Sequence, residues 1–319
     1  MFNIVDVANH LLDRQCPQSI DAVFIYNHNP VATHPDQNKM RKALGQQELF
    51  VVGCDVQMND SMSYADVILP ASTHFEHDDV YASYGHGYLQ RAEPVINPVG
   101  ESLPNTEIFR MLARRFGFKH SEFCQTDDEL IAQVFEIGKD SEFDNAAQLK
   151  TDSVLAMQTT DYRWLSADLL DTPSGLIELY SDQLQVDYNA ALPEYKEVNC
   201  SQGYVLISPA SNDRINATFG ASTKTKRELL EINPIDAQSE KLIDGEVVFV
   251  FNDLGEVELT VRVTDDVASG VLCVVKGAWC ASSATGQTVN ALISNLSKTD
   301  IADGAAYYDT FVKIKKIIS

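Results

Sequence analysis

Several patterns that would identify a common enzyme class are missing from this sequence. Its 319 residues contain no Gly-x-Gly-x-x-Gly and no Gly-x-x-x-x-Gly-Lys-Ser/Thr, so neither a standard NAD fingerprint nor a P-loop is present. There is no Gly-x-Ser-x-Gly nucleophile elbow, and no Ser-His-Asp or Cys-His catalytic set can be assembled. The six cysteines are scattered without a Cys-x-x-Cys pair, so their spacing predicts neither a zinc nor an iron–sulfur site. We expect reduced, mostly buried thiols.

Long apolar runs are also missing. None approaches the roughly 18 residues that a membrane-spanning helix needs. The N-terminus has neither the basic nor the long apolar section of a signal peptide. We therefore expect no membrane insertion. The compartment stays open: cytoplasmic if the chain is complete, periplasmic if an export signal lies upstream.

Positive charge is scarce. The chain has 24 basic and 46 acidic residues, a net charge of -22. This balance argues against nucleic acid as a partner, because phosphate neutralisation needs a surplus of Lys and Arg, and against an anionic membrane surface. Two interpretations remain: the acidic surface keeps the protein soluble, or part of it docks a basic electron-transfer partner.

The N-terminal third contains buried-strand runs followed by short polar loops. Residues 22–26 (AVFIY), 48–53 and 65–69 are typical of strands, and residues 36–44 predict a helix that ends at Gly45. A strand–helix–strand order at this spacing predicts a right-handed crossover and a parallel sheet.

The middle of the chain is less regular. Residues 71–104, with several Gly and Pro, predict an irregular segment. Helices are expected over 106–116, with Asn105 as N-cap, and near 127–137, opened by a capping box. Residues 138–170 carry no assignable pattern.

The C-terminal part changes character. Over 171–200, TPSGLIELYS predicts a turn and then a strand, and LPEYKEVN predicts a linker. From Gly203 onward, strand-like runs alternate with Gly, Asp and Asn turns, and residues 252–255 read as a hairpin loop. This pattern predicts a small closed or nearly closed β-barrel.

Polar side chains are expected at the carboxyl ends of the parallel strands, where ligands bind in open α/β sheets. The first strand would deliver Asn27, His28 and Asn29, and the second Asp55. An Asp there suits a ribose hydroxyl or a guanine edge, and an Asn-Pro turn presents amide and backbone groups to a nucleotide. The alternative is structural: the Asn-Pro pair makes a turn, and Asp55 caps the next segment.

Two further sets of polar residues have both a structural and a functional interpretation. Ser208, Ser211 and Arg214 follow a strand and could donate hydrogen bonds to a phosphate or heterocycle, or form an ordinary capped turn. A second group has metal-ligand chemistry but no HExxH arrangement, so we expect no metal site and a polar loop instead. It comprises His74, Glu76, His77, Asp78, Asp79 and His86.

Six motifs in order carry a family resemblance. They are YNHNP, YADVILPAST, YLQRAEPVINPVGES, TPSGLIELYS, the stretch from INPIDA to the Gly-Val at 270–271, and VNALI at 289–293. Together they closely resemble the C-terminal portion of the molybdopterin oxidoreductases. This bis-molybdopterin guanine dinucleotide superfamily includes dimethyl sulfoxide reductase, formate dehydrogenase and nitrate reductase. The resemblance covers roughly residues 20–118 and 171–319.

The chain departs from the family pattern at three places. Leu176 stands at a usual Lys position, HGYLQ at 86–90 replaces EGRVQ, and Glu246 stands where Asp is usual. The larger departure is that the family's N-terminal half, with its metal-ligating residue, is missing.

The resemblance implies a fold and a set of site residues. Residues 1–180 would form the second segment of a Rossmann-like α/β domain with a parallel sheet, residues 181–200 a linker, and residues 201–319 a double-psi-type β-barrel that binds the dinucleotide. Carried over by motif position, Asn29 and Asp55 would lie near a guanosine. The pterin side would be contacted by Ser208, Asn216 and Asn290.

The resulting hypothesis is the C-terminal cofactor-binding part of a molybdenum- or tungsten-dependent oxidoreductase that holds molybdopterin guanine dinucleotide. Its partner would be an N-terminal catalytic portion or a separately encoded subunit, and the chain alone would be inactive. The alternative is a stand-alone or split-gene subunit that binds the cofactor or an N-terminal chain without catalysis of its own. The substrate, and the choice of Mo or W, stay open.

Overall fold

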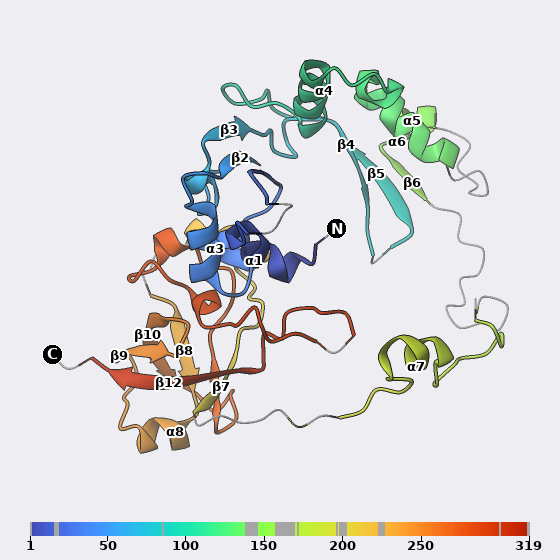
Figure 1. The fold of residues 1–319 in the computed structure, drawn as a ribbon. Helices are drawn as coiled ribbons and strands as arrows, with labels where there is room; N and C mark the ends of the chain where they lie inside the picture. Colours follow the sequence, from blue (N-terminus) through green and yellow to red (C-terminus); the bar gives the residue numbers. More distant parts are fainter. Residues whose placement is uncertain are drawn as a thin grey trace. The chain divides into compact units, whose positions relative to one another are not determined.

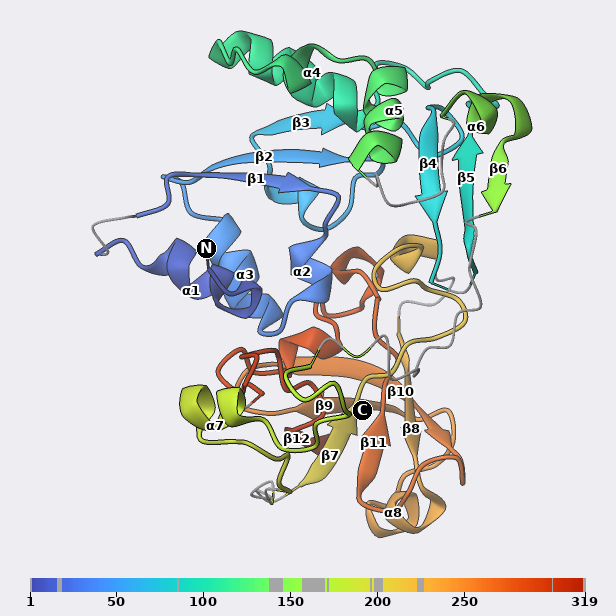
Figure 2. The same ribbon diagram turned by 90° about the vertical axis from the view of Figure 1, so that its right-hand side faces the viewer.

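The computed structural model describes residues 2–15, 19–84, 86–137, 146–156, 170, 172–195, 197, 203–222, 227–299 and 301–317. The chain divides into two compact units, one made of residues 1–68 with 195–319, the other of residues 69–194. Figures 1 and 2 show the elements of each unit. The domain boundaries expected at residues 180 and 200 remain a prediction.

The first unit begins with a small parallel sheet covered by helices. Strands β1 (Ala22–Tyr26) and β2 (Phe50–Asp55) pair in parallel, and β3 (Val67–Pro70) follows β2 in the sheet order. The apolar side chains of α1 (Val7–Leu12) and α3 (Gln37–Leu44) pack with Ile25 and Val51 (Figure 2). The predicted parallel sheet is therefore confirmed. The one-turn helix α2 (Pro30–Thr33), which the sequence patterns did not reveal, follows β1 directly.

The other part of the first unit is a closed six-stranded barrel with the strand order β10-β8-β11-β7-β12-β9. Two of its pairs, β8–β10 and β7–β11, are parallel, and the remaining four are antiparallel. Helix α8 (Pro234–Ser239) connects β8 to the following strands. The strands are β7 (Tyr204–Ile207), β8 (Leu229–Ile232), β9 (Val247–Phe251), β10 (Glu256–Val263), β11 (Val271–Cys273) and β12 (Thr310–Lys316).

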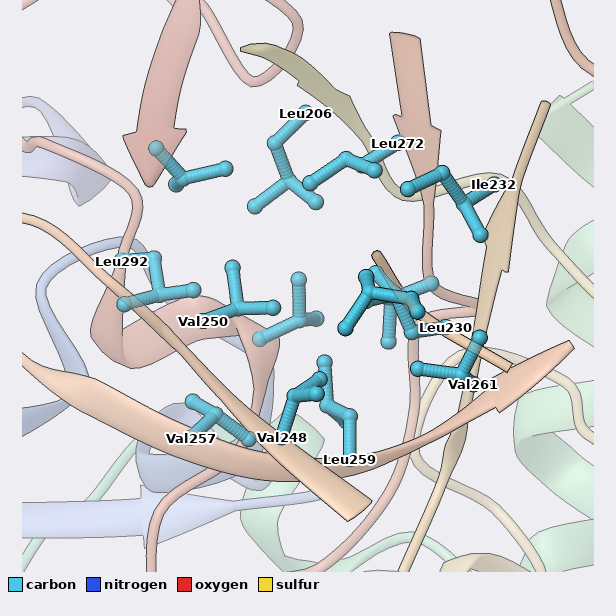
Figure 3. Packing of buried hydrophobic residues seen from close by; sticks show 14 of the residues in the cluster. Leu206, Leu230, Ile232, Val248, Val250, Val257, Leu259, Val261, Leu272 and Leu292 are labelled. Atoms are coloured by element: carbon cyan, nitrogen blue, oxygen red, sulfur yellow. The ribbon is translucent and has the colours of Figure 1, made fainter. Parts of the chain in front are cut away.

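Alternation of apolar residues fills the barrel. Along β10, every second side chain, from Val257 through Leu259 to Val261, is buried, as the two-residue period of a strand requires. Figure 3 shows these side chains meeting those of Leu230 and Leu272 from other strands. The predicted barrel is confirmed, with the hairpin loop closed by Asn252 N–H donating to the Gly255 carbonyl at 3.1 Å.

The second unit combines helices with an antiparallel three-stranded sheet in the order β4-β5-β6. Buried Arg91 of β5 pairs with Asp78 and Asp128, which ties the sheet to α5. Capping of α5 occurs as predicted, since Glu129 N–H donates to Thr126 Oγ1 and Thr126 N–H to Glu129 Oε2. The elements are β4 (Asp79–Ala82), β5 (Tyr88–Ala92), α4 (Asn105–Phe116), α5 (Asp127–Ile137), α6 (Ala146–Asp152), β6 (Val154–Ala156) and α7 (Asp182–Tyr188).

Three sequence predictions were wrong in detail. The irregular segment expected over 71–104 contains the β4–β5 hairpin, whose polar and aromatic composition hid the strand signal. The N-cap of α4 is Pro104, and Asn105 is its first helical residue. The second strand begins and ends two residues later than expected, so Asp55 is its last residue and does not follow it.

The strand expected within TPSGLIELYS is also wrong. Residues 172–181 form a turn and bends instead of a strand, and side chains there make local hydrogen bonds. Thr172 Oγ1 donates to the Leu176 carbonyl at 2.7 Å, and Ser174 N–H and Oγ both donate to Glu178 Oε1. Ser181 then caps α7, a helix that the sequence patterns missed. Such local bonds compete with pairing into a sheet. Among the described residues, no helix is long and apolar enough to cross a membrane.

Candidate functional site

The carboxyl ends of β1 and β2 lie side by side. Tyr26 is opposite Cys54 in the parallel register, and Asn27 N–H donates to the Cys54 carbonyl at 3.3 Å. Asn27 has a left-handed backbone, with φ of 49°, which turns the chain out of the strand at a residue type that tolerates this conformation. The turn directs the next three residues over the end of the sheet, and Asp55 ends the neighbouring strand at the same level.

Asn29 is held by Ser61 and has one amide hydrogen-bond donor to spare. Ser61 Oγ donates to Asn29 Oδ1 at 2.7 Å, and Ser61 N–H donates to the same oxygen at 3.3 Å. Asn29 is only 8% exposed, yet its Nδ2 has no hydrogen-bond partner among the described residues. A buried donor without an acceptor costs about 1–3 kcal/mol. The amide is therefore oriented by its oxygen and offers its nitrogen to a ligand.

Asp55 belongs to the same hydrogen-bond network. Asn59 Nδ2 donates to Asp55 Oδ2 at 2.8 Å, and Asn59 Oδ1 accepts from Ser61 N–H at 2.9 Å. Desolvation by burial raises the pKa of Asp55, against the opposing effect of the Val56 and Gln57 backbone N–H groups. The chain Asp55–Asn59–Ser61–Asn29 thus brings together the two residues expected near a guanosine.

Two histidines form a close pair beside this network. His28 Nε2 and His34 Nε2 lie 2.7 Å apart, so one ring donates to the other. His34 is 7% exposed, and its Nδ1 has no partner among the described residues. Burial lowers the pKa of His34 to about 4 and also lowers the pKa of His28, whereas the nearby Asp55 carboxylate opposes the shift at His28. Burial therefore favours the neutral form of both rings.

Loops of the barrel hold helix α2 in place by hydrogen bonds. Asn290, in the short helix η7 (Val289–Ala291), is buried and donates from Nδ2 to the Ala32 carbonyl at 2.8 Å. Gln37 Nε2 donates both to the Val31 carbonyl and to Thr288 Oγ1, each at 2.9 Å. The bonds to Thr288 and from Asn290 join residues more than 250 positions apart, so the barrel fixes the helix that Asn29 begins.

Asp60 makes a second connection to the barrel. Its carboxylate accepts from the N–H groups of Cys280 and Ala281, at 2.6 and 3.2 Å. These N–H groups belong to the first turn of the short helix η6 (Cys280–Ser282). Burial raises the pKa of Asp60, and the two N–H donors oppose the increase. The loop that carries Ser61 is thereby anchored.

Asn216 lies in a loop under close steric control. Its own φ is 51°, and its carbonyl oxygen would be 1.8 Å from a Cβ at Gly277, whose φ is 96°. Trp279 Nε1 donates to the Ala217 carbonyl at 2.6 Å, and Ala217 and Trp279 pack against Ala32. Asn216 is exposed, but the packing of its neighbours places it next to α2.

Ser208, Ser211 and Arg214 are found in the segment after β7. Ser208 is 3% exposed, and among the described residues no hydrogen bond joins it to the other four predicted site residues. Arg214 forms a bidentate pair with Glu228, at 2.9 and 2.8 Å, while its Nε and the Ser211 Oγ are buried without a partner in the described part of the chain. Glu228 thus occupies two of the three guanidinium nitrogens of Arg214, and two buried polar atoms remain available to a ligand.

The cluster around residues 74–86 lies in the second unit and serves the loop structure. Glu76 is buried, and its two carboxylate oxygens accept from Thr73 N–H and Val99 N–H, both at 2.6 Å. These bonds lower the pKa of Glu76. His77 Nδ1 bonds to Ser72 Oγ at 2.9 Å. Among the described residues, no group of three or more His, Cys, Asp and Glu could hold a metal ion.

Replacing Glu76 tests this structural role. Glu76→Ala removes the acceptor of two backbone N–H groups, so we expect the free energy of unfolding to fall by about 1–3 kcal/mol. Urea unfolding measures the change. The control is Glu101→Ala, an exposed residue in the same unit, for which we expect less than about 0.5 kcal/mol. Equal effects of the two substitutions would contradict a structural role for the hydrogen bonds of Glu76.

The supporting residues Asn59, Ser61 and Gln37 were not predicted as part of the site. The pair Asn59-Asp60 could have indicated the site, because it places two polar residues in the loop that follows a strand. The histidine pair was also missed, because His34 lies six residues from its partner and the intervening one-turn helix was not predicted.

The site fits a large polar heterocyclic ligand such as a pterin dinucleotide. Of the eight buried side-chain polar atoms without a partner among the described residues, four belong to this site: Asn29 Nδ2, His34 Nδ1, Ser211 Oγ and Arg214 Nε. Buried polar groups in native proteins are nearly always satisfied. Three of these atoms are hydrogen-bond donors or hydroxyls, which suits the carbonyl, ring-nitrogen and phosphate acceptors of such a cofactor.

Two family models match this chain. Residues 6–115 match the molybdopterin oxidoreductase model, and residues 204–311 match the molydopterin dinucleotide binding domain. Among curated proteins, the chain is 34% identical over 325 residues to probable oxidoreductase YoaE of Bacillus subtilis, covering 99% of this chain and 47% of the relative. It is 30% identical over 287 residues to the dimethyl sulfoxide/trimethylamine N-oxide reductase of Cereibacter sphaeroides, covering 79% of this chain and 35% of the relative.

A solved structure has the same fold. Acetylene hydratase from Pelobacter acetylenicus aligns with a TM-score of 0.82 at 20% identity, covering 99% of this chain and 47% of that chain. This chain therefore spans about half the length, or less, of these relatives. The ordered motifs, the two matching models and the similarity to the curated relatives agree: the chain belongs to the molybdopterin oxidoreductase family.

Proposed function

We propose that this chain binds molybdopterin guanine dinucleotide and holds it for a molybdenum- or tungsten-dependent oxidoreductase. The observation that carries the proposal is the buried Asn29 Nδ2, which has no partner among the described residues and is linked to Asp55 through Asn59 and Ser61 at the carboxyl ends of two parallel strands. Its backing is the position expected for ligands in open α/β sheets and the family's dinucleotide-binding model in the barrel.

Each residue has a role in binding and orientation. Asn29 and Asp55 would hydrogen-bond the guanosine, and Ser208, Asn216 and Asn290 would contact the pterin side. When bound, the metal with its dithiolene ligands supplies the redox chemistry, and the protein supplies position and electrostatics. Asn290 also holds α2 by its hydrogen bond to Ala32. It would therefore connect the pterin side of the site in the barrel to the guanosine side at Asn29.

The finer architecture belongs to the same proposal. We infer a double-psi type for the barrel, supported by its six closed strands with two parallel pairs. We also place the chain as the C-terminal portion of the complete enzyme, working with an N-terminal catalytic portion or a separately encoded subunit. The alternative is a stand-alone or split-gene subunit that binds the cofactor or an N-terminal chain without catalysis of its own. Co-purification with a second polypeptide would favour a split enzyme, and a stable monomer that binds guanine dinucleotide would favour a binding module.

Nucleotide binding by the 319-residue chain tests the proposal. We expect GMP to bind with detectable heat in isothermal titration calorimetry, and AMP to bind more weakly. Asp55→Asn replaces one acceptor oxygen by an amide, and a bidentate contact to a base is worth about 1–3 kcal/mol. We therefore expect a loss of about 5- to 150-fold in GMP affinity.

The matched control is Asp244→Asn, the same change at an exposed carboxylate that accepts a backbone N–H from Val263 at 2.9 Å. It should leave GMP binding unchanged. Failure of the wild-type chain to bind GMP, or an equal loss in both variants, would refute the proposed site.

A further inference from the structure

The two histidines next to the proposed nucleotide site share one hydrogen bond, and one of the two rings must supply its hydrogen. His28 Nε2 and His34 Nε2 are 2.7 Å apart, which is a hydrogen-bond distance. A neutral imidazole has one N–H and one bare nitrogen, and the partner of one nitrogen sets the state of the other. The direction of this bond therefore fixes the tautomers of both rings.

Burial of His34 selects the direction. If His34 accepted at Nε2, its Nδ1 would carry a hydrogen, and that N–H would be buried without an acceptor among the described residues. For backbone groups, a buried N–H without an acceptor is rarer than an under-satisfied acceptor, and we apply the same preference to the ring nitrogens of His34. The better arrangement places the hydrogen on Nε2 of His34, which donates to His28. The Nδ1 of His34 is then a bare nitrogen.

His28 is left with a hydrogen on Nδ1, and it stands next to a carboxylate. Asp55 is close enough to act electrostatically on His28, and the Asp55 hydrogen bonds found in the structure go to Asn59 and to the backbone. In the proposed site, the Nδ1–H of His28 would be the donor and the Asp55 carboxylate the acceptor offered to a base. Guanine is complementary, with the O6 acceptor next to the N1–H and N2–H donors. Adenine has no carbonyl and offers only its exocyclic amine as a donor on that edge.

We propose that His34 is a positioning residue that holds His28 in its Nδ1–H tautomer, and that His28 thereby becomes a specificity-determining donor to a ring carbonyl of the bound base. The inference rests on the proposed nucleotide-binding function. It differs from the role given to Asp55, because it assigns discrimination between guanine and adenine to a second residue and its buried support. A site that hydrogen-bonds a specific group rejects an analogue lacking it strongly.

Nuclear magnetic resonance of the histidine rings tests the tautomer without any ligand. In the 319-residue chain at pH 7.5, we expect His28 to show a protonated Nδ1 and a bare Nε2 in long-range proton–nitrogen spectra. His34→Phe removes the donor, so His28 should become a mixture of tautomers. His34→Gln keeps an N–H donor within reach and should restore the Nδ1–H form. A wild-type His28 protonated at Nε2 would overturn the proposal, whatever the variants do.

Calorimetric titration with GMP and AMP tests the consequence. We expect His34→Phe to weaken GMP binding about tenfold and AMP binding much less, and His34→Gln to recover most of the loss. An unchanged ratio of GMP to AMP affinity in His34→Phe would overturn the positioning role alone. Absence of GMP binding by the wild-type chain would instead overturn the proposed function and the selectivity with it, whichever tautomer His28 adopts. If His34→Phe does not fold, the wild-type tautomer and His34→Gln still decide.

Discussion

Gly277→Ala should be among the most damaging single substitutions in the barrel. The φ of Gly277 is +96°, and an added Cβ would lie 1.8 Å from the Asn216 carbonyl oxygen and 3.3 Å from Arg214 Cδ. The first obstacle is backbone, so it cannot be relieved by a side-chain rotation. We expect the free energy of unfolding to fall by about 3–5 kcal/mol, measured by urea denaturation at pH 7.5.

A second glycine separates the two causes. Gly270 also has a positive φ, +86°, but nothing lies within 4 Å of its Cβ position. Gly270→Ala should therefore cost only the left-handed conformation, about 1 kcal/mol. A similar loss in both variants would show that the close approach of Asn216 to Gly277 is not what matters. Since that approach holds the Asn216 loop, Gly277→Ala should also reduce cofactor binding, whereas Gly270→Ala should not.

The second large expected effect is a loss of folding stability at low pH, caused by His34. The pKa of His34 is about 4 in the folded chain, against an ordinary value of 6.5, because burial disfavours the charged ring. Above pH 6.5 the ring is neutral in both states and adds no pH dependence. Between pH 6.5 and 4 the unfolded chain binds a proton that the folded chain does not, so stability falls as the pH is lowered. The full loss is about 3 kcal/mol.

The comparison variant is His34→Gln, which cannot titrate. The difference in unfolding free energy between wild type and His34→Gln should be constant above pH 7 and should shrink or reverse steadily toward pH 4. Asp55 and Asp60, whose pKa values burial raises, act in the opposite direction near their own pKa values, but they do so in both proteins. A difference that stays flat from pH 7 to pH 4 would contradict the buried neutral histidine.

The sequence predicted what depends on local periodicity. The parallel strands at 22–26 and near 50–55, the helix that ends at Gly45 and the barrel all follow from alternation, capping residues and turns. It also predicted that Asn29 and Asp55 lie together, since parallel strand ends meet at one edge of a sheet.

The remaining features depend on partners far away in the chain. Nothing near Gln37 indicates that its amide bonds Thr288, and nothing near Gly277 indicates that Asn216 fills the space a side chain would need. The strands β8 and β12 likewise became clear only from their pairing in the closed barrel. Short-range patterns cannot encode such contacts. They also misread TPSGLIELYS, where hydrogen bonds between side chains and the local backbone outweighed strand propensity.

The hydrogen bonds between the barrel loops and α2 have a consequence for biosynthesis. Residues 1–68 complete their unit only with residues 195–319, and the bond from Asn290 to Ala32 spans 258 positions. At about 5–20 residues per second, a ribosome needs roughly 13–50 s to make that stretch. Throughout this interval the nascent β1–β2 sheet lacks the barrel segments that later cover α2. Chaperone capture or aggregation should therefore be concentrated in the period before the segment around Asn290 emerges, and slowing translation there should lower the yield of folded protein.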